Sequence, residues 1–209
     1  MINMVFDILS KLKEVVERKR EIRKMDWLQD RGMHIGKDVF IPISTWIDAS
    51  HCYLISVGDR CRFGPNCVLL AHDATMNELL DAGKIGKITI HESCSIGFGT
   101  IILPGVEIGP NVIIGAYSVI STNIPPGSIV TGNPAKVVGK IKDFERYHRM
   151  LMKKQPLFPY DKYGSHTLPE QRRKEIMDSL GENPNSCGYI TGGYTAMKDS
   201  GEFYSGRNK

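Results

Sequence analysis

Isoleucine recurs at every sixth residue through the middle of the chain. The series is Ile90, Ile96, Ile102, Ile108, Ile114 and Ile120. A period of six differs from the 3.6 residues of an α-helix and the two residues of a simple strand, and it indicates a repeat architecture. Because six is a multiple of two, all these side chains point to one face of an extended chain. That face is buried if the chain coils around it and turns a corner in every repeat.

The same spacing predicts how the coils stack. If each coil has three sides, isoleucines that are three repeats apart lie over one another, about 4.8 Å apart. The predicted pairs are Ile90 with Ile108, Ile96 with Ile114 and Ile102 with Ile120. The pattern already begins at Ile35-Gly36, slips over residues 51–55, where we expect a bulge at a corner, and resumes at Val57-Gly58. We therefore predict a parallel β-solenoid with a core of stacked aliphatic side chains.

The repeat divides the chain into three parts. Residues 33–141 form the predicted solenoid, with an inserted loop over residues 70–87, where the six-residue period stops. Residues 142–209 form a C-terminal extension with helices expected over 142–154 and 167–180, followed by a tail rich in Gly, Ser and Asn. This tail has almost no core-forming pattern, so it is either flexible or ordered only by contact with a neighbour.

Residues 1–32 are predicted to form an amphipathic helix, over residues 2–24, and a linker. Apolar residues spaced by three and four positions form a narrow stripe, namely Ile2, Val5, Leu9, Leu12 and Val16. The many lysines and arginines beside the stripe would suit a helix that lies on a membrane surface. Acidic residues dilute that charge, so we favour packing on the bare end of the solenoid or on a partner subunit.

Composition excludes several classes of protein. The net charge of +4 is too small to indicate nucleic-acid binding, and no apolar run approaches the roughly 20 residues of a membrane span. The N-terminal residues lack the pattern of a signal peptide. The five cysteines have no metal-ligand spacing, and Cys61, Cys67 and Cys94 occupy small-residue positions of the repeat, where we expect buried thiols. A reducing cytoplasm fits best.

The motifs after the insertion are the most specific part of the chain. They include Leu103-Pro104-Gly105, Ile124-Pro125-Pro126-Gly127 and Gly132-Asn133-Pro134-Ala135-Lys136. With these residues, positions 33–141 resemble the hexapeptide-repeat acyltransferases, and within them the sugar O-acetyltransferases such as maltose and galactoside acetyltransferases. The resemblance implies an all-β fold, a left-handed parallel β-helix of about five coils, here with an N-terminal helix and a C-terminal helical extension. The left-handedness comes from the resemblance alone, because parallel β-crossovers are normally right-handed.

The resemblance also implies a reaction. Acetyl would pass from acetyl-CoA to a sugar hydroxyl, on a bacterial surface polysaccharide or a nucleotide- or lipid-linked sugar, by direct attack without an acyl-enzyme. It implies a homotrimer with active sites at the subunit interfaces, and neither a metal nor a nucleic acid is expected. His72 stands at the position of the family's general base, at the start of the inserted loop. Imidazole suits this role because its unperturbed pKa lies near neutrality.

Other site residues follow by position. The adjacent Asp73 is a candidate catalytic partner that orients His72, although Glu78 and Asp81 are also available. Asp48 and His51, on the coil beneath the insertion, and Glu78 are candidates for contact with the acceptor.

The resemblance places the cosubstrate along the repeat corners. The implied contacts of the pantetheine arm and the CoA phosphates are Gly97, Gly99, Gly115, Ala116, Lys136 and Lys140. Ser95 departs from the family, because relatives usually carry tryptophan there.

Three alternatives remain open. The same scaffold could transfer acetyl to the nitrogen of an amino sugar or a xenobiotic. It could be a non-catalytic trimeric assembly module. A hydratase of the γ-carbonic anhydrase type has a similar β-helix but needs three zinc-binding histidines, whose spacing is not evident here.

Overall fold

The computed structural model describes residues 2–164, 168–183, 185–193, 195 and 204, without the side chains of residues 2–11 and 14. The chain divides into two compact units. One contains Met1–Ile141 with Phe203–Lys209, and the other contains Lys142–Glu202.

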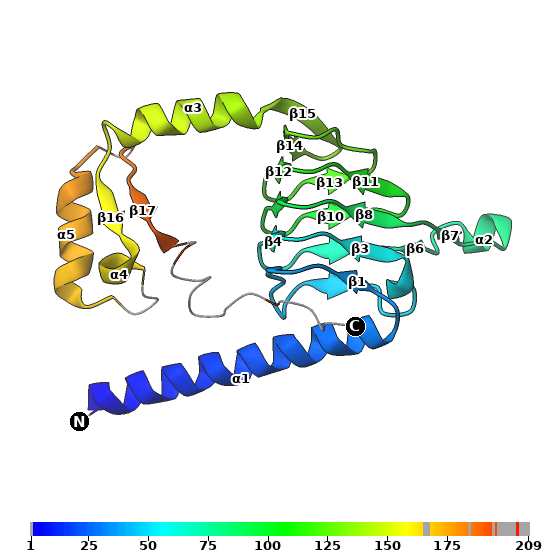
Figure 1. Cartoon of the computed structure of the whole chain (residues 1–209), viewed down its shortest axis with the longest axis horizontal. Helices are drawn as coiled ribbons and strands as arrows, with labels where there is room; N and C mark the ends of the chain where they lie inside the picture. Colours follow the sequence, from blue (N-terminus) through cyan, green and yellow to red (C-terminus); the bar gives the residue numbers. More distant parts are fainter. Residues whose placement is uncertain (1, 165–167, 184, 194, 196–203, 205–209) are drawn as a thin grey trace. The chain divides into compact units, whose positions relative to one another are not determined.

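The first unit is a solenoid of three parallel sheets that the chain visits in turn (Figure 1). The first sheet contains β1 (His34–Ile35), β3 (Ile55–Val57), β8 (Ile88–Ile90) and β11 (Val106–Ile108). The second contains β4 (Arg62–Phe63), β9 (Ser95–Ile96), β12 (Ile113–Ile114) and β14 (Ser128–Gly132), with β15 (Ala135–Lys140) antiparallel to β14. The third contains β2 (Trp46–Ile47), β5 (Val68–Leu69), β10 (Ile101–Ile102) and β13 (Val119–Ile120). The predicted parallel solenoid is thus confirmed.

The predicted register is also confirmed. The paired residues are Ile90 and Ile108, Ile96 and Ile114, and Ile102 and Ile120. All six side chains are buried, and the thiols of Cys61, Cys67 and Cys94 are buried among them. An aliphatic core of this kind stabilises each coil through its neighbours above and below.

The prediction of a bulge at the slip in the repeat is wrong. Residues Cys52–Leu54 form a short 3₁₀ helix, η1, that turns the corner between β2 and β3. The thiol of Cys52 is buried there and faces the backbone carbonyls of Leu28 and Arg31. The extra residues of this corner therefore pack against the N-terminal helix instead of widening a strand.

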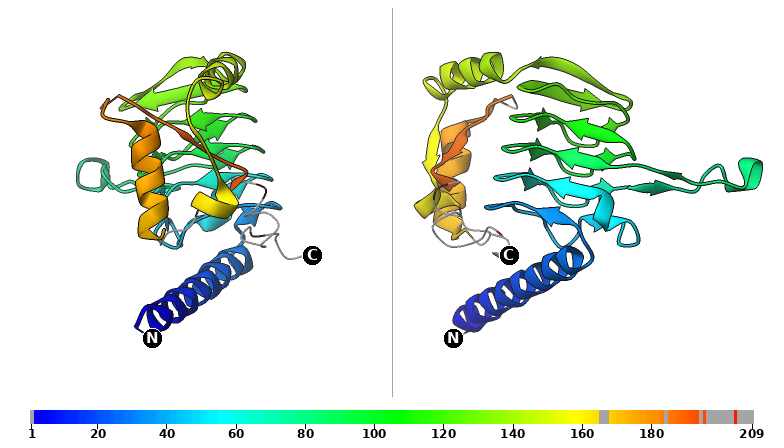
Figure 2. Two further views of the ribbon diagram at one scale, coloured as in Figure 1. Left: turned by 90° about the vertical axis from the view of Figure 1, so that its left-hand side faces the viewer. Right: turned by 45° about the vertical axis from the view of Figure 1, so that its right-hand side comes forward.

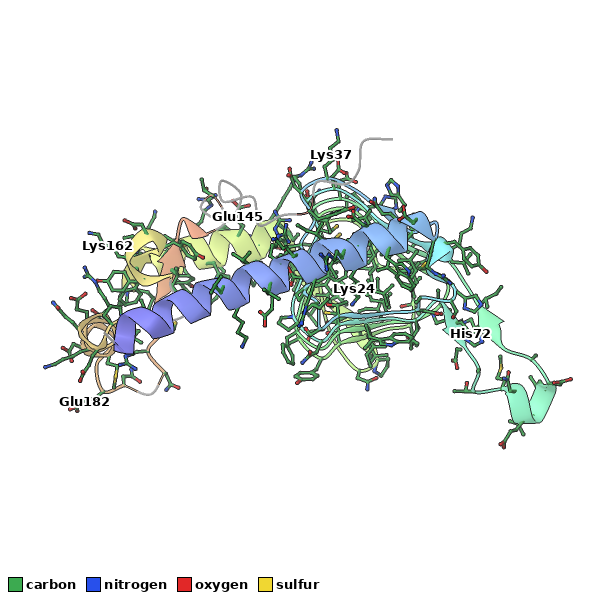
Figure 3. The ribbon with its side chains drawn as sticks, turned by 90° about the horizontal axis from the view of Figure 1, so that it is seen from below. Lys24, Lys37, His72, Glu145, Lys162 and Glu182 are labelled. Atoms are coloured by element: carbon green, nitrogen blue, oxygen red, sulfur yellow. The ribbon has the colours of Figure 1, made fainter. Side chains whose placement is uncertain are left out.

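The N-terminal helix α1 (Ile2–Asp30) extends six residues beyond the predicted end at residue 24. Its last turns cover the bare end of the first coil, where Met25 and Leu28 are buried. Lys24 lies over the same end (Figure 3), and its Nζ donates to the carbonyl oxygen of Ile43. Two described members of the predicted stripe, Leu12 and Val16, are instead 55% and 47% exposed. The solenoid thus buries Met25 and Leu28, which follow the predicted stripe along α1.

Tyr204 belongs to this end of the solenoid. Its backbone pairs with Val39, its side chain is buried, and its hydroxyl donates to Oδ1 of Asp26 at 2.8 Å. The C-terminal segment therefore contributes a residue to the core that its composition does not predict.

The second unit follows β15. It contains most of α3 (Ile141–Met152), then β16 (Leu157–Pro159), α4 (Tyr160–Tyr163), α5 (Glu170–Leu180) and β17 (Tyr189–Thr191), which pairs in parallel with β16. The helices predicted over 142–154 and 167–180 correspond to α3 and α5, although residue 167 lies outside the described residues. Part of the tail thus forms a strand.

Residues 70–87 leave the solenoid as a separate arm (Figures 1 and 2). Strand β6 (His72–Asp73) pairs antiparallel with β7 (Lys84–Ile85), and the short helix α2 (Asn77–Leu80) forms the tip. The tip exposes the apolar side chains of Leu79 and Leu80, and β7 exposes that of Ile85. Among the described helices, none is both long and apolar enough to cross a membrane.

Candidate active site

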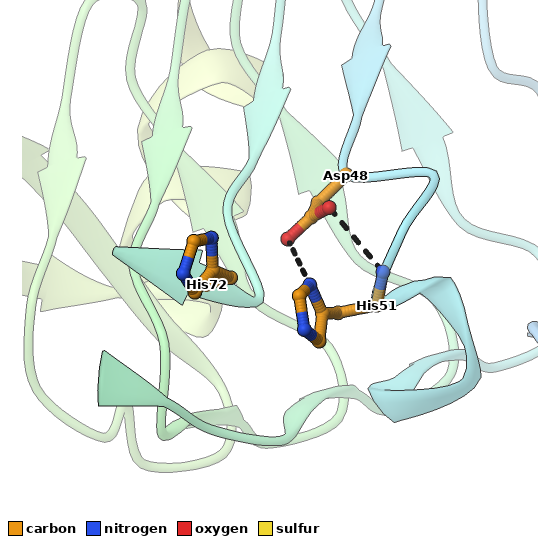
Figure 4. A group of neighbouring side chains, drawn as sticks. All are labelled: Asp48, His51 and His72. Atoms are coloured by element: carbon orange, nitrogen blue, oxygen red, sulfur yellow. Dashed lines mark hydrogen bonds and ion pairs between the residues drawn. The ribbon is translucent and has the colours of Figure 1, made fainter. Parts of the chain in front are cut away.

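Three chemically active side chains meet where the third sheet turns into the first. Asp48 follows β2, and His72 follows β5 on the next coil. Strands β2 and β5 pair directly, and the backbone N–H of Asp48 donates to the carbonyl oxygen of Leu69 at 3.0 Å. The stacking of two coils therefore brings Asp48 and His51, from one corner, beside His72 at the base of the arm (Figures 3 and 4).

Asp48 is only 4% exposed and anchors its own turn. Its Oδ1 accepts hydrogen bonds from the hydroxyl of Ser50 at 2.6 Å and from the backbone N–H groups of Ser50 and His51 at 3.2 and 3.3 Å. Burial alone would raise the pKa of Asp48, but these hydrogen bonds and the nearby imidazole outweigh it, so the pKa lies below its ordinary value. Asp48 is therefore an ionised carboxylate at neutral pH.

The hydroxyl of Ser50 determines which nitrogen of His51 carries the proton. Its single hydrogen points to Asp48, so its oxygen accepts from Nδ1 of His51 at 3.0 Å. Oδ2 of Asp48 also lies 3.4 Å from this Nδ1 (Figure 4). In the neutral ring, Nδ1 is then protonated and Nε2 has a free lone pair. We assign this tautomer from the hydrogen-bond network.

His72 lies against His51. The two rings are stacked, with centroids 4.8 Å apart and planes inclined by 24°. The opposite strand of the arm also limits the position of His72, since a Cβ atom on Gly83 would lie 2.9 Å from Nε2 of His72. A glycine at position 83 therefore leaves room for the imidazole.

The acidic residues of the arm have other partners. Oδ1 of Asp73 accepts from the backbone N–H of Thr75 at 3.0 Å, and this hydrogen bond is the main reason that the pKa of Asp73 is lowered. Glu78 lies on α2 at the exposed tip. In the described hydrogen bonds, neither carboxylate is joined to His72. The carboxylate that lies in one cluster with both imidazoles is Asp48, whose ligand atom is within 4.8 Å of a nitrogen of each ring.

The glycine corners that follow the second sheet lie on the other edge of the third sheet. Gly97 and Gly99 lie between β9 and β10, and Gly115 and Ala116 between β12 and β13. A Cβ on Gly97 would lie 2.5 Å from the backbone nitrogen of Ala116, so the next coil already requires glycine there. The absence of a side chain at Gly97 is thus explained by coil packing, without a ligand.

The two lysines and Ser95 lie on the second sheet. Lys136 and Lys140 are exposed on β15, and Nζ of Lys140 is 3.5 Å from Oγ of Ser128. Ser95 is exposed on β9, between Arg62 and Ile113 of the neighbouring strands. None of these three residues is at the corner that holds His72.

Two residues, Ser50 at this corner and Gly83 on the arm, have roles that the sequence did not predict. Ser50 bonds to both Asp48 and His51, and a serine two residues after an aspartate is a familiar turn pattern that could have indicated it. Gly83 faces His72 across the arm, and its local sequence contains no comparable signal.

Comparison with known sequences identifies the repeat. Residues 87–122 match the family model described as "Bacterial transferase hexapeptide (six repeats)". The chain carries hexapeptide repeats of the bacterial transferase type. This match covers the part of the solenoid in which the six-residue period is most regular.

Curated relatives are acetyltransferases. The chain is 33% identical over 106 residues to the putative acetyltransferase YvoF of Bacillus subtilis, covering 51% of this chain and 59% of that protein. It is 31% identical over 120 residues to galactoside O-acetyltransferase of Escherichia coli, covering 56% and 58%. The match thus spans less than two thirds of each relative. A solved maltose O-acetyltransferase from Clostridium difficile is 25% identical, with a TM-score of 0.47, over 61% of this chain and 87% of that one.

Proposed function

We propose that this protein is an acetyl-CoA-dependent O-acetyltransferase that acts on a sugar hydroxyl and is built on a left-handed β-helix. The observation that carries the proposal is the meeting of His72 with His51 and the buried Asp48 at one corner of a transferase-type hexapeptide solenoid. The sequence similarity to galactoside O-acetyltransferase supports the class of acceptor.

In this reaction His72 acts as the general base. Its neutral imidazole takes the proton of the sugar hydroxyl while the oxygen attacks the carbonyl carbon of the thioester. The carbon–sulfur bond then breaks, and the CoA thiolate takes up the proton that His72 holds. His51, held by Asp48 and stacked on His72, contacts the acceptor beside the attacking oxygen. In this proposal Asp73 orients His72, and Glu78, on α2 at the tip of the arm, contacts the acceptor.

Acetyl-CoA binds along the glycine corners and Lys136 and Lys140 in this proposal. These corners and His72 lie on opposite edges of the third sheet within one chain. A base from one subunit therefore meets the thioester held at the corner of a neighbouring subunit. The proposed assembly is a homotrimer with shared active sites.

The outward face of the third sheet supports this assembly. Its outward residues are paired in one apolar column, Trp46, Val68, Ile101 and Val119. The corresponding column of the first sheet is polar, namely His34, Ser56, Thr89 and Glu107. Trp46 is 51% exposed in the single chain, and a continuous apolar surface of this kind is typical of a protein interface. The third sheet is therefore the proposed subunit contact.

Ile101→Asp is expected to convert the trimer to a monomer, because it places an unpaired charge in the centre of the apolar column. Size-exclusion chromatography with light scattering measures the change, and acetyl transfer should fall along with the trimer. Thr89→Asp, at an outward position of the first sheet, is the matched control and should remain trimeric. A monomeric wild-type protein with full activity would contradict the shared site.

Gly83→Ala is expected to lower acetyl transfer roughly 10- to 100-fold, because the new methyl group displaces the ring of His72, and displacements near 1 Å have effects of this size. Thermal stability should hardly change, since the ring can rotate away. Gly139→Ala adds a methyl group where the nearest atoms are 3.9 Å away and serves as the control. Equal activity of the two variants would show that the arm does not position His72.

A panel of acceptors tests the proposed function directly. The protein is incubated with acetyl-CoA and a set of neutral and amino sugars, and release of free CoA thiol is followed. A base-labile acetyl product on a neutral sugar would support O-transfer. A base-stable product on amino sugars would indicate the N-acetyltransferase alternative. No saturable acetyl-CoA binding and no thiol release would instead support a non-catalytic assembly module.

A further inference from the structure

Asp48, His51 and His72 have the composition and spacing of a metal-binding site. One carboxylate oxygen and one ring nitrogen from each histidine lie within 4.8 Å of one another. Oδ2 of Asp48 and Nδ1 of His51 are 3.4 Å apart. Two ligand atoms bound tetrahedrally to Zn²⁺ at its usual bond lengths are about 3.3 Å apart, so this pair already has the required separation. Ligation through Nδ1 would require the other neutral tautomer of His51, with the proton on Nε2, and would replace the hydrogen bond from Nδ1 to Ser50. A small rotation of His72 would bring in the third ligand.

The state of Asp48 points independently to a ligand. Its Oδ2 is buried and accepts no hydrogen bond, whereas Oδ1 accepts three. The 3.4 Å to Nδ1 of His51 exceeds the usual hydrogen-bond distance. A buried carboxylate oxygen without a hydrogen bond is costly, and a bound cation would compensate for it. The hydrogen bonds to Oδ1 would meanwhile hold the carboxylate in place, as groups behind a metal ligand commonly do.

The donor set selects a class of ion. Two imidazoles and one carboxylate suit Zn²⁺, Co²⁺ or Ni²⁺, whereas Mg²⁺ and Ca²⁺ prefer oxygen ligands throughout. Three protein ligands would leave a coordination position for water. We propose that Asp48, His51 and His72 form a site for a divalent transition metal, and that an ion bound there inhibits acetyl transfer by occupying the lone pair of His72. The inhibition rests on the proposed function, whereas the binding does not.

Binding is tested first, without acetyl-CoA. Zn²⁺ is titrated calorimetrically into untagged protein that carries Cys187→Ser, because the thiol of Cys187 is exposed and could bind zinc elsewhere. One ion per chain is expected. Each of three substitutions, Asp48→Asn, His51→Gln and His72→Gln, should weaken Zn²⁺ binding. Loss of a group that only supports a metal ligand weakens binding roughly 10- to 100-fold, so loss of a ligand itself should cost at least as much. Circular dichroism confirms that each variant is folded.

His91→Gln is the matched control. His91 also pairs with a carboxylate, Glu107, at 2.8 Å, but this pair is exposed on another part of the solenoid. The control should bind Zn²⁺ like the parent protein. Unchanged affinity in Asp48→Asn, or an equal loss in His91→Gln, would overturn the proposed site. Co²⁺ provides a second readout, because its visible absorption bands should show nitrogen and oxygen coordination in the parent and disappear in Asp48→Asn.

Inhibition is tested separately. Zn²⁺ should lower the release of CoA thiol by the parent protein, and EDTA should restore it. In Asp48→Asn, whose inhibition is expressed as a fraction of its own zinc-free activity, the Zn²⁺ concentration that inhibits should be at least tenfold higher. Tight Zn²⁺ binding that leaves acetyl transfer unchanged would overturn the inhibitory role. Site-specific Zn²⁺ binding without transferase activity would refute the proposed function but support the metal site. Transferase activity without Zn²⁺ binding would support the proposed function and refute the metal site.

Discussion

His72→Ala is expected to reduce kcat/KM for acetyl transfer by about 10²- to 10⁴-fold, the usual contribution of a general base. The variant removes the proton acceptor but no core contact, because His72 is only half-buried at the base of the arm. The fold and the thermal midpoint should therefore remain near those of the wild type. Steady-state kinetics with acetyl-CoA and the best sugar of the acceptor panel measure the loss.

The histidine controls distinguish the base from its neighbour. His91→Ala changes an exposed histidine outside the corner and should leave the rate near that of wild type. His51→Ala should raise KM for the sugar more than it lowers kcat, because His51 is proposed to contact the acceptor. If His72→Ala retained full turnover while His51→Ala lost it, the base would instead be His51, which has the buried carboxylate of Asp48 as its partner.

Ile114→Ala is expected to destabilise the protein by about 2–5 kcal/mol, as other truncations of large buried aliphatic residues do. Ile114 is 2% exposed and lies between Ile96 on one coil and Val130 on the next. The cavity left by alanine interrupts the column that joins these coils. In a domain of this size such a change corresponds to a fall of roughly 4–20 °C in the thermal midpoint.

Ile113→Ala is the matched control, since it makes the same chemical change at the next residue of β12. Ile113 points outward and is only partly buried, so its truncation should cost about 1 kcal/mol or less. Thermal and denaturant unfolding of both variants measure the difference. Similar destabilisation by the two substitutions would contradict the alternation of inward and outward side chains on which the register rests.

The six-residue series was sufficient to predict the pairing of coils. Ile96 and Ile114 were expected to stack because a period that is a multiple of two always returns the side chain to the same face, and three such repeats complete one coil. The structure of residues 51–55 does not follow from the repeat, because a corner has no period. Their 3₁₀ helix is adapted to the carbonyl groups of Leu28 and Arg31, which come from a distant part of the chain.

The candidate site was predictable only in part. The resemblance to the hexapeptide-repeat acyltransferases, together with the stop in the repeat, points to His72, and the place of Asp48 and His51 on the coil below makes them candidates. Only the tertiary structure shows the hydrogen bonds of Ser50 and the position of Gly83 against His72. The roles of the glycine corners, of Lys136 and Lys140, and of Asp73 and Glu78 stay predictions.

The sequence by itself determined which residues face the core and which coils lie against each other, because side-chain alternation and a constant repeat length settle both questions locally. Only the tertiary structure decided which polar groups meet at the corners. Asp48, His51 and His72 come together because two stacked strands end at the same edge while their corner segments differ in length and conformation. No periodic pattern encodes that meeting, since it depends on how each corner packs against the coil and the helix beside it.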